Sequence, residues 1–395
     1  MKVLFSAANC LIDPSSGAAI SIRTIFRLLQ RRGITCRSLT GSVFDRADST
    51  DNVENLRRAG ATPLDPAAPL TQPWRYEEGG VEHFIVPLAR NVRALQTRND
   101  EERLFAEAGR MLAEFEPDIV ISYGAGLFER SLVEMARARG ISTVFYLANP
   151  TYQNLSSFAG IDQVVFDTEA TRSLYRDRLG LEGVAIGKFV APPALPDNAP
   201  HDHVLFVNPS AEKGVTLFYR IAELALEVAP ALRFLVVESR ASLAIAEQRT
   251  GMGFSRMANI ERVGLQSDIG AVFARTRVLL QPSLWHESGA RTAIEAMSLG
   301  IPVVATDRGG IPEVLGEAGI MIPPPKPLID NHWLIPPKLS AIDWVEALRL
   351  LTEDAEFHAD HAALARASFQ RHDPEPRITA LIALFDGIRA RRQPA

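Results

Sequence analysis

The chain has 395 residues, too many for one ordinary hydrophobic core and enough for two domains of average size. Its composition is 47% hydrophobic and 23% charged, as in ordinary folded proteins, and its formal net charge of −5 gives no reason to expect nucleic acid as a partner. The two cysteines, Cys10 and Cys36, are too few for a disulfide framework and lack metal-ligand spacing, which fits a reducing cytoplasm.

The N-terminal apolar run is too short for the core of a signal peptide and is soon followed by Asp13 and Pro14, so we interpret it as a first buried strand. No stretch approaches the ~18–20 uninterrupted apolar residues that span a bilayer. We therefore expect a cytoplasmic protein that is not integral to a membrane, with peripheral contact at the inner face of the membrane left open.

Short apolar runs alternate with helical patterns in the first half of the chain, which predicts a parallel sheet covered by helices. A helix is predicted at 18–32, where apolar residues recur with helical spacing until Gly33. The polar, proline-containing segment 40–75 is predicted to be mostly irregular. The predicted strands are 2–7, 34–39, 81–87, 118–122, 142–147 and 163–166.

The second half repeats this rhythm after a segment with four prolines between Phe189 and Asp202, which cannot lie inside a helix or a central strand. The sequence therefore predicts two Rossmann-like, doubly wound parallel-sheet domains, which bind ligands beyond the carboxyl ends of their strands, so that the expected site is the cleft between them. An amphipathic C-terminal helix is expected to cross back to the first domain. The predicted boundaries are 1–190 for the first domain, 191–202 for the linker, 203–373 for the second domain and 374–395 for the last helix. The strands predicted in the second domain are 203–207, 232–237, 260–263, 277–281 and 302–305.

The most informative segment runs from Leu279 to Pro325 and reads LLQPSLWHESGARTAIEAMSLGIPVVATDRGGIPEVLGEAGIMIPPP. It divides into strand, loop, helix, strand, loop and helix. A helix is predicted to start near Gly289, and its first turn offers free backbone N–H groups and a positive dipole end that suit a diphosphate. Glycine at that position lets the backbone approach phosphate oxygens closely.

Two glutamates in this segment are candidate ligand-binding residues. Glu287 lies in the loop before the helix, where it can accept hydrogen bonds from sugar hydroxyls, and Glu295 lies two turns into the helix, where its carboxylate can bind ribose hydroxyls. The alternatives are structural: Arg291 and Glu295 have the spacing of a helix-surface ion pair, and Glu287 can simply favour the helix N-terminus. The seven-residue separation of the glutamates, within this strand–loop–helix pattern, favours the functional interpretation.

The segment resembles the retaining family 4 glycosyltransferases of the GT-B fold, also described as glycosyl transferases group 1. The matching residues are Pro282-Ser283, Glu287, Glu295-Ala296-Met297, Gly300-Ile301-Pro302-Val303-Val304-Ala305 and Gly309-Gly310-Ile311-Pro312-Glu313. The resemblance implies that Glu287 contacts the donor sugar and Glu295 the ribose. It also implies transfer with retention of configuration, without a metal or other cofactor, in which the donor's own phosphate helps to deprotonate the acceptor.

Further segments extend the resemblance within the second domain. Lys213 follows the strand 203–207 and corresponds to a lysine that contacts the donor phosphates, where it can neutralise a leaving diphosphate. Many relatives have an arginine five or six residues earlier, where this chain has Val207 and Asn208. Part of the phosphate site is therefore either missing or supplied from elsewhere, for example by Arg240 or Arg291, and Arg240 fits an ordinary surface arginine equally well. The backbone at Gly289 and Ala290 is expected to contribute to the same site. Val263 lies on the strand that in the family reads the base through backbone groups.

The first domain departs more from the family pattern. Gly17 lies in the loop that in relatives approaches the donor sugar and acceptor, but the second glycine common there is Ala18. At the strand exit where many relatives have a histidine, this chain has Asn149, which we predict to hydrogen-bond the donor sugar in its place. A stripe of arginines, Arg23, Arg27 and Arg31, fits either an anionic membrane surface or an ordinary solvated helix face.

The leading hypothesis is thus a glycosyltransferase that moves a sugar from a nucleoside diphosphate sugar to an unknown acceptor. The alternatives are a GT-B relative with other chemistry, such as a sugar-nucleotide epimerase, and a non-catalytic nucleotide-sugar-binding descendant. A Rossmann dehydrogenase is disfavoured, because no Gly-x-Gly-x-x-Gly follows the first strand. The base, the sugar, the acceptor and the oligomeric state are not encoded in any motif.

Overall fold

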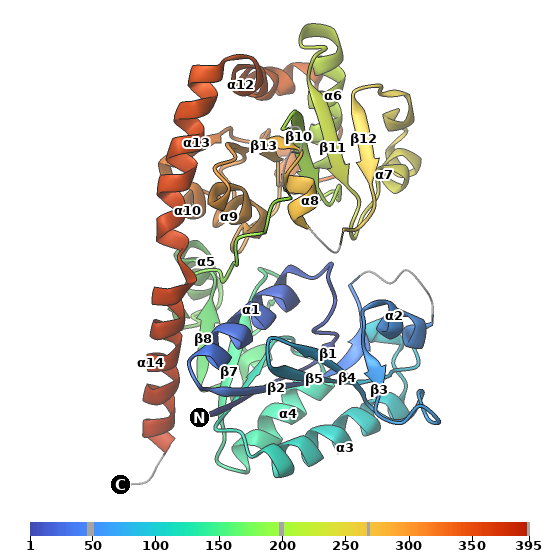
Figure 1. Ribbon diagram of the computed structural model, residues 1–395, viewed down its shortest axis with the longest axis vertical. Helices are drawn as coiled ribbons and strands as arrows, with labels where there is room; N and C mark the ends of the chain where they lie inside the picture. Colours follow the sequence, from blue (N-terminus) through green and yellow to red (C-terminus); the bar gives the residue numbers. More distant parts are fainter. Residues whose placement is uncertain (46–50, 197–200, 267–268, 393–395) are drawn as a thin grey trace. The chain divides into compact units, whose positions relative to one another are not determined.

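The computed structural model of the protein describes residues 1–45, 51–196, 201–266 and 269–392 (Figure 1). The chain divides into two compact units. The first unit consists of Met1–Asp167, Arg172–Phe189 and Pro374–Ala395, and the second of Thr168–Thr171 and Val190–Asp373. The last helix, α14 (Pro374–Arg392), therefore belongs to the first unit although it follows the whole of the second in sequence.

A nine-stranded sheet forms the centre of the first unit, in the order β3-β4-β5-β2-β1-β6-β7-β8-β9. Its ladders are parallel except where β4 pairs antiparallel with β3 and β5. The strands are β1 (Lys2–Asn9), β2 (Thr35–Val43), β3 (Thr62–Pro63), β4 (Trp74–Glu78), β5 (Val81–Val86), β6 (Ile119–Ser122), β7 (Ser142–Leu147), β8 (Gln163–Phe166) and β9 (Val184–Ala185). The helices of this unit include α1 (Gly17–Arg31), α2 (Asn52–Arg58), α3 (Arg98–Phe115), α4 (Leu127–Arg137) and, from Arg172 onward, α5 (Glu169–Leu179).

Both faces of this sheet are covered because its central strands are apolar on both sides. On β1, Phe5 packs with α1 and α14 on one face, whereas Leu4 packs with α3 and α4 on the other. Four apolar residues of α14 at helical spacing complete the first of these layers, so this C-terminal segment is part of the hydrophobic core of the first unit. These residues are Ile378, Leu381, Phe385 and Ile388.

The second unit contains a six-stranded parallel sheet in the order β12-β11-β10-β13-β14-β15. The chain moves outward in one direction from β10 through β11 and β12 and then returns to the other side of β10 with β13. The strand order thus reverses between β10 and β13, and we call this place the switch point. The strands are β10 (His203–Val207), β11 (Arg233–Val237), β12 (Ile260–Val263), β13 (Thr276–Gln281), β14 (Val303–Ala305) and β15 (Gly319–Met321).

Helices cover both faces of the second sheet as well. One face packs against α6 (Val215–Val228), α7 (Leu243–Thr250) and α12 (Ile342–Glu353), and the other against α8 (Ile269–Phe273), α9 (Arg291–Ser298), α10 (Ile311–Leu315) and α13 (Ala355–Phe369). Each unit is therefore a doubly wound α/β domain, as the sequence predicts.

The prediction of an irregular segment at 40–75 is wrong in part. Strand β2 continues to Val43, α2 begins after Asp51, whose side chain accepts a hydrogen bond from the Val53 N–H at 2.9 Å, and β4 begins at Trp74. The short edge strands lack the alternation that marks longer ones, and a seven-residue helix is too short to show a clear apolar stripe. Strand β15 was not predicted either, for the same reason.

Candidate functional site

Two loops meet at the switch point of the second unit, one after β10 and one after β13. The backbone N–H groups of Leu284 and Trp285 donate to the carbonyl of Glu212 at 2.9 and 3.3 Å. Gly214 has φ +83°, and a Cβ there would lie 2.0 Å from the carbonyl oxygen of Pro282. The loops pack backbone against backbone because they leave neighbouring parallel strands at the same edge of the sheet.

This packing brings together Lys213 and Glu287, which are far apart in sequence. The Lys213 Nζ forms an ion pair with Glu287 Oε1, and the Ser283 hydroxyl donates to the same oxygen at 2.6 Å. Only 7% of Glu287 is exposed. Burial alone would raise the pKa of this carboxyl, but Lys213, Ser283 and the charge of Arg240 outweigh it and hold the pKa below its usual value. Glu287 is therefore an anion held between cations.

Arg240 follows β11, the neighbour of β10, and its side chain is exposed. Its charge acts on the Glu287 carboxyl, so a second cation faces the same site from another strand exit. The position where relatives have an arginine is occupied by Asn208, whose N–H donates to the carbonyl of Val237 at 2.9 Å.

The backbone is unusual at two residues of these loops. Among the described residues, only Glu116, Asn208 and Ala290 combine a side chain with a positive φ. Glu116 ends α3, but Asn208 (φ +61°) and Ala290 (φ +38°) both lie at the switch point. A left-handed backbone costs a non-glycine residue about 1–2 kcal/mol, and such conformations persist mainly where function requires a particular loop shape.

Helix α9 begins at Arg291, two residues after the predicted start near Gly289. The Arg291 Nε lies 2.9 Å from Glu295 Oε1, so the ion pair named as the structural alternative is formed. It is nevertheless nearly buried, with side chains 14% and 10% exposed, and is not a helix-surface pair. Burial raises the pKa of Glu295 above its usual value, against the opposing charge and hydrogen bond of Arg291.

Several buried polar atoms around the switch point have no hydrogen-bond partner: Asn208 Oδ1, Gln281 Oε1, Trp285 Nε1 and Ser288 Oγ. Leaving a buried polar group unsatisfied costs about 1–3 kcal/mol, and native proteins rarely gather such groups. Their presence beside Lys213 and Glu287 makes the switch point a candidate site for a polar ligand. Sequence reasoning did not single out Gln281 or Ser288, since a polar residue at a strand end has many uses.

The remaining residue predicted in this unit, Val263, ends β12. Its carbonyl accepts a hydrogen bond from the Glu238 N–H at 2.8 Å as part of the sheet, and the next carbonyl, that of Gly264, accepts from the Gln266 side chain at 3.0 Å. Both carbonyls therefore already have a protein partner.

Gly17 and Asn149 belong to the first unit. Gly17 is the first residue of α1 and has open space where a Cβ would lie, and Ser16 before it forms no side-chain capping bond. Asn149 Oδ1 accepts hydrogen bonds from the N–H, at 3.0 Å, and the hydroxyl of Thr151, so that oxygen stabilises a local turn.

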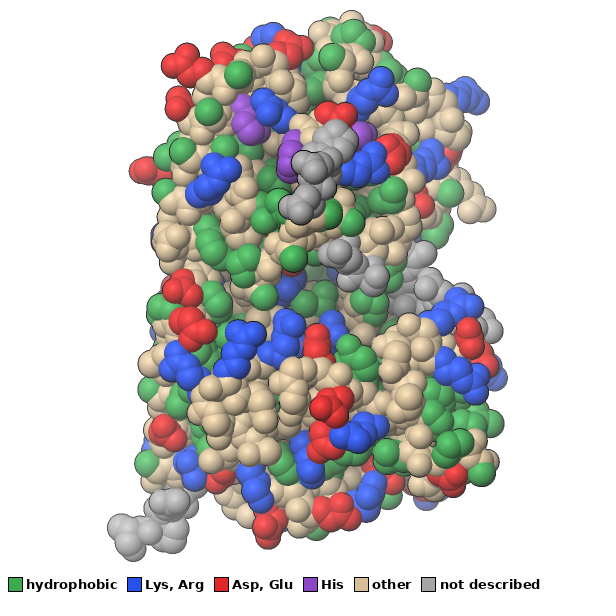
Figure 2. All heavy atoms as spheres, viewed as in Figure 1, with side chains coloured by type: hydrophobic (Ala, Val, Ile, Leu, Met, Phe, Trp, Pro, Cys, Tyr) green, Lys and Arg blue, Asp and Glu red, His purple; other side chains and the backbone are tan. Residues whose placement is uncertain are grey.

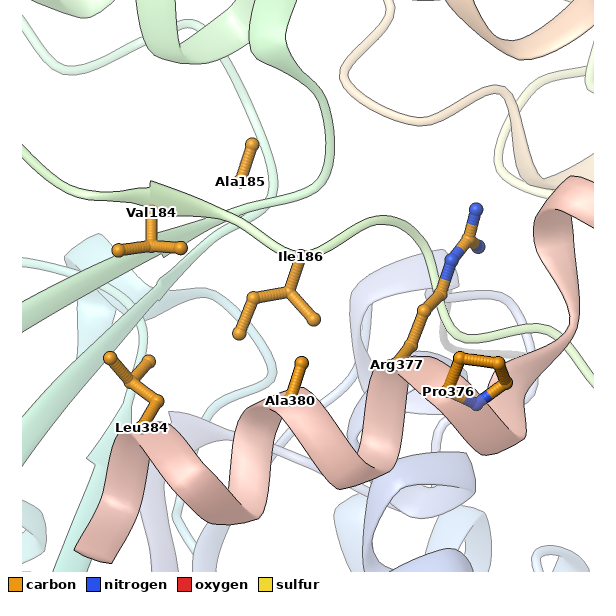
Figure 3. Close-up of a pocket in the computed structure, with 7 residues that line it drawn as sticks. All are labelled: Val184, Ala185, Ile186, Pro376, Arg377, Ala380 and Leu384. Atoms are coloured by element: carbon orange, nitrogen blue, oxygen red, sulfur yellow. The ribbon is translucent and has the colours of Figure 1, made fainter. Parts of the chain in front are cut away.

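The first unit also has a pocket of about 390 Å³ between β9 and α14 (Figure 3). Apart from Arg377 its lining is apolar, and Arg377 donates to the carbonyl of Lys188 at 2.5 Å. The pocket lacks the carboxylates and clustered cations of the switch point. Its lining residues are Val184, Ala185, Ile186, Pro376, Arg377, Ala380 and Leu384.

The arginine stripe on α1 is partly neutralised. Figure 2 shows basic side chains over α1 with carboxylates among them. Arg23 and Arg27 each lie 3.5 Å from a carboxylate oxygen of Glu78 on β4, so this face is less basic than the sequence spacing indicates. Among the helices of the described ranges, none is long and apolar enough to cross a membrane. In the same ranges, no group of three or more His, Cys, Asp or Glu side chains is arranged to hold a metal ion.

Comparison with known sequences points to one family. The sequence model described as "Glycosyl transferases group 1" matches residues 201–331. The D-inositol 3-phosphate glycosyltransferase of Corynebacterium jeikeium (strain K411) is 27% identical over 151 residues, which are 36% of this chain and 32% of that protein. The match thus spans about a third of the length of this curated relative.

Solved structures show the fold of the whole chain. Alr3699/HepE of Anabaena, in complex with UDP and glucose, superposes with a TM-score of 0.68 at 16% identity, over 98% of this chain and 100% of that one. Sucrose-phosphate synthase (tll1590) from Thermosynechococcus elongatus superposes with a TM-score of 0.66 at 15% identity, over 99% of both chains. Residues 201–331 are therefore similar to the glycosyl transferases group 1 family, within a chain that has the GT-B fold of two Rossmann-like domains.

Proposed function

We propose that the protein is a glycosyltransferase that moves a sugar from a nucleoside diphosphate sugar to an acceptor hydroxyl with retention of configuration. The observation that carries this proposal is the partly buried ion pair between Glu287 and Lys213 at the switch point, within the segment that matches the family. An anion for the sugar and a cation for the diphosphate are thereby held side by side.

The groups around this pair can bind each part of such a donor. Lys213 and Arg240 supply positive charge for the diphosphate, and the backbone N–H groups from Gly289 to Arg291 lie at the positive end of α9. Glu287 accepts hydrogen bonds from sugar hydroxyls. Glu295, on α9, binds the ribose hydroxyls. Asn208 and Val263 border the phosphate and base positions respectively.

The chemistry follows from this arrangement. The bond between the anomeric carbon and the diphosphate oxygen breaks, the electron pair leaves with the diphosphate, and Lys213 and Arg240 stabilise the developing charge. The acceptor oxygen forms the new bond on the same face, and its proton passes to the departing phosphate oxygen. In this proposal, Lys213 and Arg240 balance the negative charge of the departing diphosphate without a metal ion. We also retain Gly17 and Asn149, in the first unit, as candidate contacts for the donor sugar.

The relatives suggest which donor to test first. Alr3699/HepE of Anabaena was solved with UDP-glucose as well as with UDP and glucose, so uridine diphosphate sugars are the first probes. A melting-temperature panel of UDP, GDP, ADP and TDP with their glucose conjugates identifies the ligand, since binding to the native state raises the melting temperature.

The proposal is then tested by sugar transfer from the donor that gives the largest shift. Glu287→Ala should reduce transfer by at least ~100-fold, because the sugar loses its anionic contact at the reacting centre. The matched control is Glu346→Ala, which removes a glutamate 54% exposed on α12 of the same unit and should leave the rate unchanged. Near-normal turnover by Glu287→Ala would contradict the proposal, and an epimerised donor formed without acceptor would indicate the epimerase alternative.

A further inference from the structure

We propose that Thr168 and Thr171 are positioning residues for Glu287, and that they act by holding the two residues that flank it, His286 and Ser288. This inference rests on the proposed function, because Glu287 needs a fixed position only if it contacts the reacting sugar. Both threonines belong to the second unit.

Hydrogen bonds connect the threonines to both sides of Glu287. The Thr168 hydroxyl donates to the carbonyl of Ser288 at 2.7 Å. The Thr168 and Thr171 hydroxyl oxygens lie 3.0 Å apart, and Thr171 Oγ1 lies 3.2 Å from His286 Nε2. Both threonines are buried, with 2% and 0% of their surfaces exposed. Residues more than a hundred positions away in sequence thus contact the residue on either side of Glu287, through the Ser288 carbonyl and the His286 ring.

The available protons determine the direction of these bonds. A carbonyl only accepts, so the Thr168 proton is used on Ser288. Of the acceptors near the Thr171 hydroxyl, Thr168 Oγ1 at 3.0 Å is closer than the Ser288 carbonyl at 3.5 Å, so we assign the Thr171 proton to Thr168. In this arrangement Thr171 Oγ1 accepts from His286, whose proton then lies on Nε2. A continuous chain of donors therefore runs from the side chain before Glu287 to the carbonyl after it, and each bond polarises the next.

A second loop fixes the threonines in place. The carboxylate of Glu313, on α10, accepts from the N–H groups of Glu169 and Ala170 at 3.0 and 2.9 Å, and these two residues lie between the threonines in the second unit. In the same loop, the Gly310 N–H donates to the Glu287 carbonyl at 2.6 Å. The Gly-Gly-Ile-Pro-Glu motif thus contacts Glu287 at its first end and the segment Thr168–Thr171 at its other end.

Glycine is required where these segments meet. A Cβ on Gly309, at φ +60°, would lie 2.5 Å from the Glu287 nitrogen. A Cβ on Gly310 would lie 2.9 Å from the Ser288 oxygen and from Thr168 Cγ2. The backbone of Glu287 is therefore enclosed between the glycines and the threonines, while Lys213 and Ser283 fix its carboxylate. This explains how a residue in an irregular loop keeps a defined position.

The proposal is tested with Thr168→Ala and Thr171→Val and with the rescuing variants Thr168→Ser and Thr171→Ser. Displacement of Glu287 should lower the kcat of transfer by about 10–100-fold, since small misplacements at a reacting centre have effects of this size. The affinity for the nucleoside diphosphate alone should stay within about twofold, and both serine variants should restore kcat to within about threefold.

The matched control is Thr276→Ala. Its hydroxyl is also buried and donates to a carbonyl, that of Val272, at 2.9 Å, but it lies at the opposite end of β13 from the switch point. This variant should keep the wild-type kcat. A Thr168→Ala protein with the wild-type kcat would overturn the positioning role. The role would also be overturned if the variants lost diphosphate affinity as much as transfer and if the serine variants did not restore kcat.

A second readout is independent of activity. ¹⁵N NMR of His286 should show the Nε2-protonated imidazole in the wild-type protein and in Thr276→Ala, and a changed signal in Thr171→Val. An Nδ1-protonated His286 in the wild type would overturn the donor chain. A wild-type protein that transfers no sugar would instead overturn the proposed function, while an active enzyme indifferent to both threonine substitutions would overturn this inference alone.

Discussion

Two glutamates eight positions apart have pKa values shifted in opposite directions, although both are buried. Glu287 faces Lys213 and the charge of Arg240, so its pKa is lowered in spite of burial. Glu295 has only Arg291 beside it, and burial raises its pKa. The partner charges, and not the degree of burial, decide the difference. Groups whose environments separate their pKa values in this way are typical of functional sites.

Burial also shifts the pKa of His83. This residue lies on β5 of the first unit, and its Nδ1 lies 2.8 Å from the Ser38 hydroxyl. Burial, together with the charge of Arg23, lowers the pKa of His83 to about 3. An unfolded chain binds this proton near pH 6.5, so the free energy of unfolding should fall as the pH is lowered from about 6.5 towards 3.

The measurement is urea unfolding at pH 7, 5.5 and 4 of the wild type and His83→Asn, which keeps a polar atom near Ser38 without a titrating group. The variant should show a flatter pH dependence between 6.5 and 4. His201→Asn, at an exposed position, is the control and should follow the wild type. If the free energy of unfolding of His83→Asn depended on pH as steeply as that of the wild type, His83 would not be the cause of the loss of stability.

At the level of single residues, the sequence indicated the proposed ligand-binding residues of the candidate site better than the residues that hold them in place. The spacing of Glu287 and Glu295 and the strand-exit position of Lys213 were visible in local patterns, and the structure brings Lys213 and Glu287 into contact. Thr168, Thr171 and Glu313 act over separations of more than a hundred residues. No local pattern encodes such contacts. Asn149 was singled out for the sugar, yet its Oδ1 is occupied by Thr151.

At the level of elements, most strands and helices were predictable from apolar runs and from the helical spacing of apolar residues. The strands β10 and β12 begin and end where the sequence pattern places them. Short elements were missed: α2, β3, β4, β9 and β15 have between two and seven residues, too few for a period to be recognised.

The close packing of the two switch-point loops leads to a prediction about Gly214. Gly214→Ala should lower the free energy of unfolding by about 2–4 kcal/mol, because the methyl group would combine a left-handed φ with a clash against Pro282. Gly251→Ala is the matched control, since its φ is +74° and no atom lies within 4 Å of the added Cβ. It should cost only about 1 kcal/mol. Equal losses in urea titrations of both variants would show that the loops do not need this contact.

At the level of the whole molecule, the chain builds its first unit from segments at both ends. Helix α14 supplies apolar residues to the same core layer as α1, and Arg389 lies 2.9 Å from Asp118. Amphipathic spacing predicted this helix, and proline positions indicated the linker. No local pattern indicated that Thr168–Thr171 belong to the second unit, because strand β8 before the segment and most of α5 after it belong to the first.

A chain ending at Asp373 should therefore lose the cooperative unfolding of the first unit, since it exposes the core face that α14 covers. The second unit, which keeps its own core, should still unfold cooperatively and be stabilised by a nucleoside diphosphate. Differential scanning calorimetry distinguishes the two transitions, with a chain ending at Arg392 as the control. If the chain ending at Asp373 lost the unfolding transitions of both units, the two hydrophobic cores would not be independent.

The central claim is that the second unit binds a nucleotide sugar through Glu287. Isothermal titration calorimetry with UDP and UDP-glucose, and with the GDP, ADP and TDP pairs as further arms, tests it most directly. For one pair, the wild type should bind the sugar conjugate more tightly than the diphosphate alone. In Glu287→Gln this advantage should disappear while diphosphate affinity stays within about threefold. Absence of binding for every pair, or an unchanged advantage in Glu287→Gln, would contradict the account.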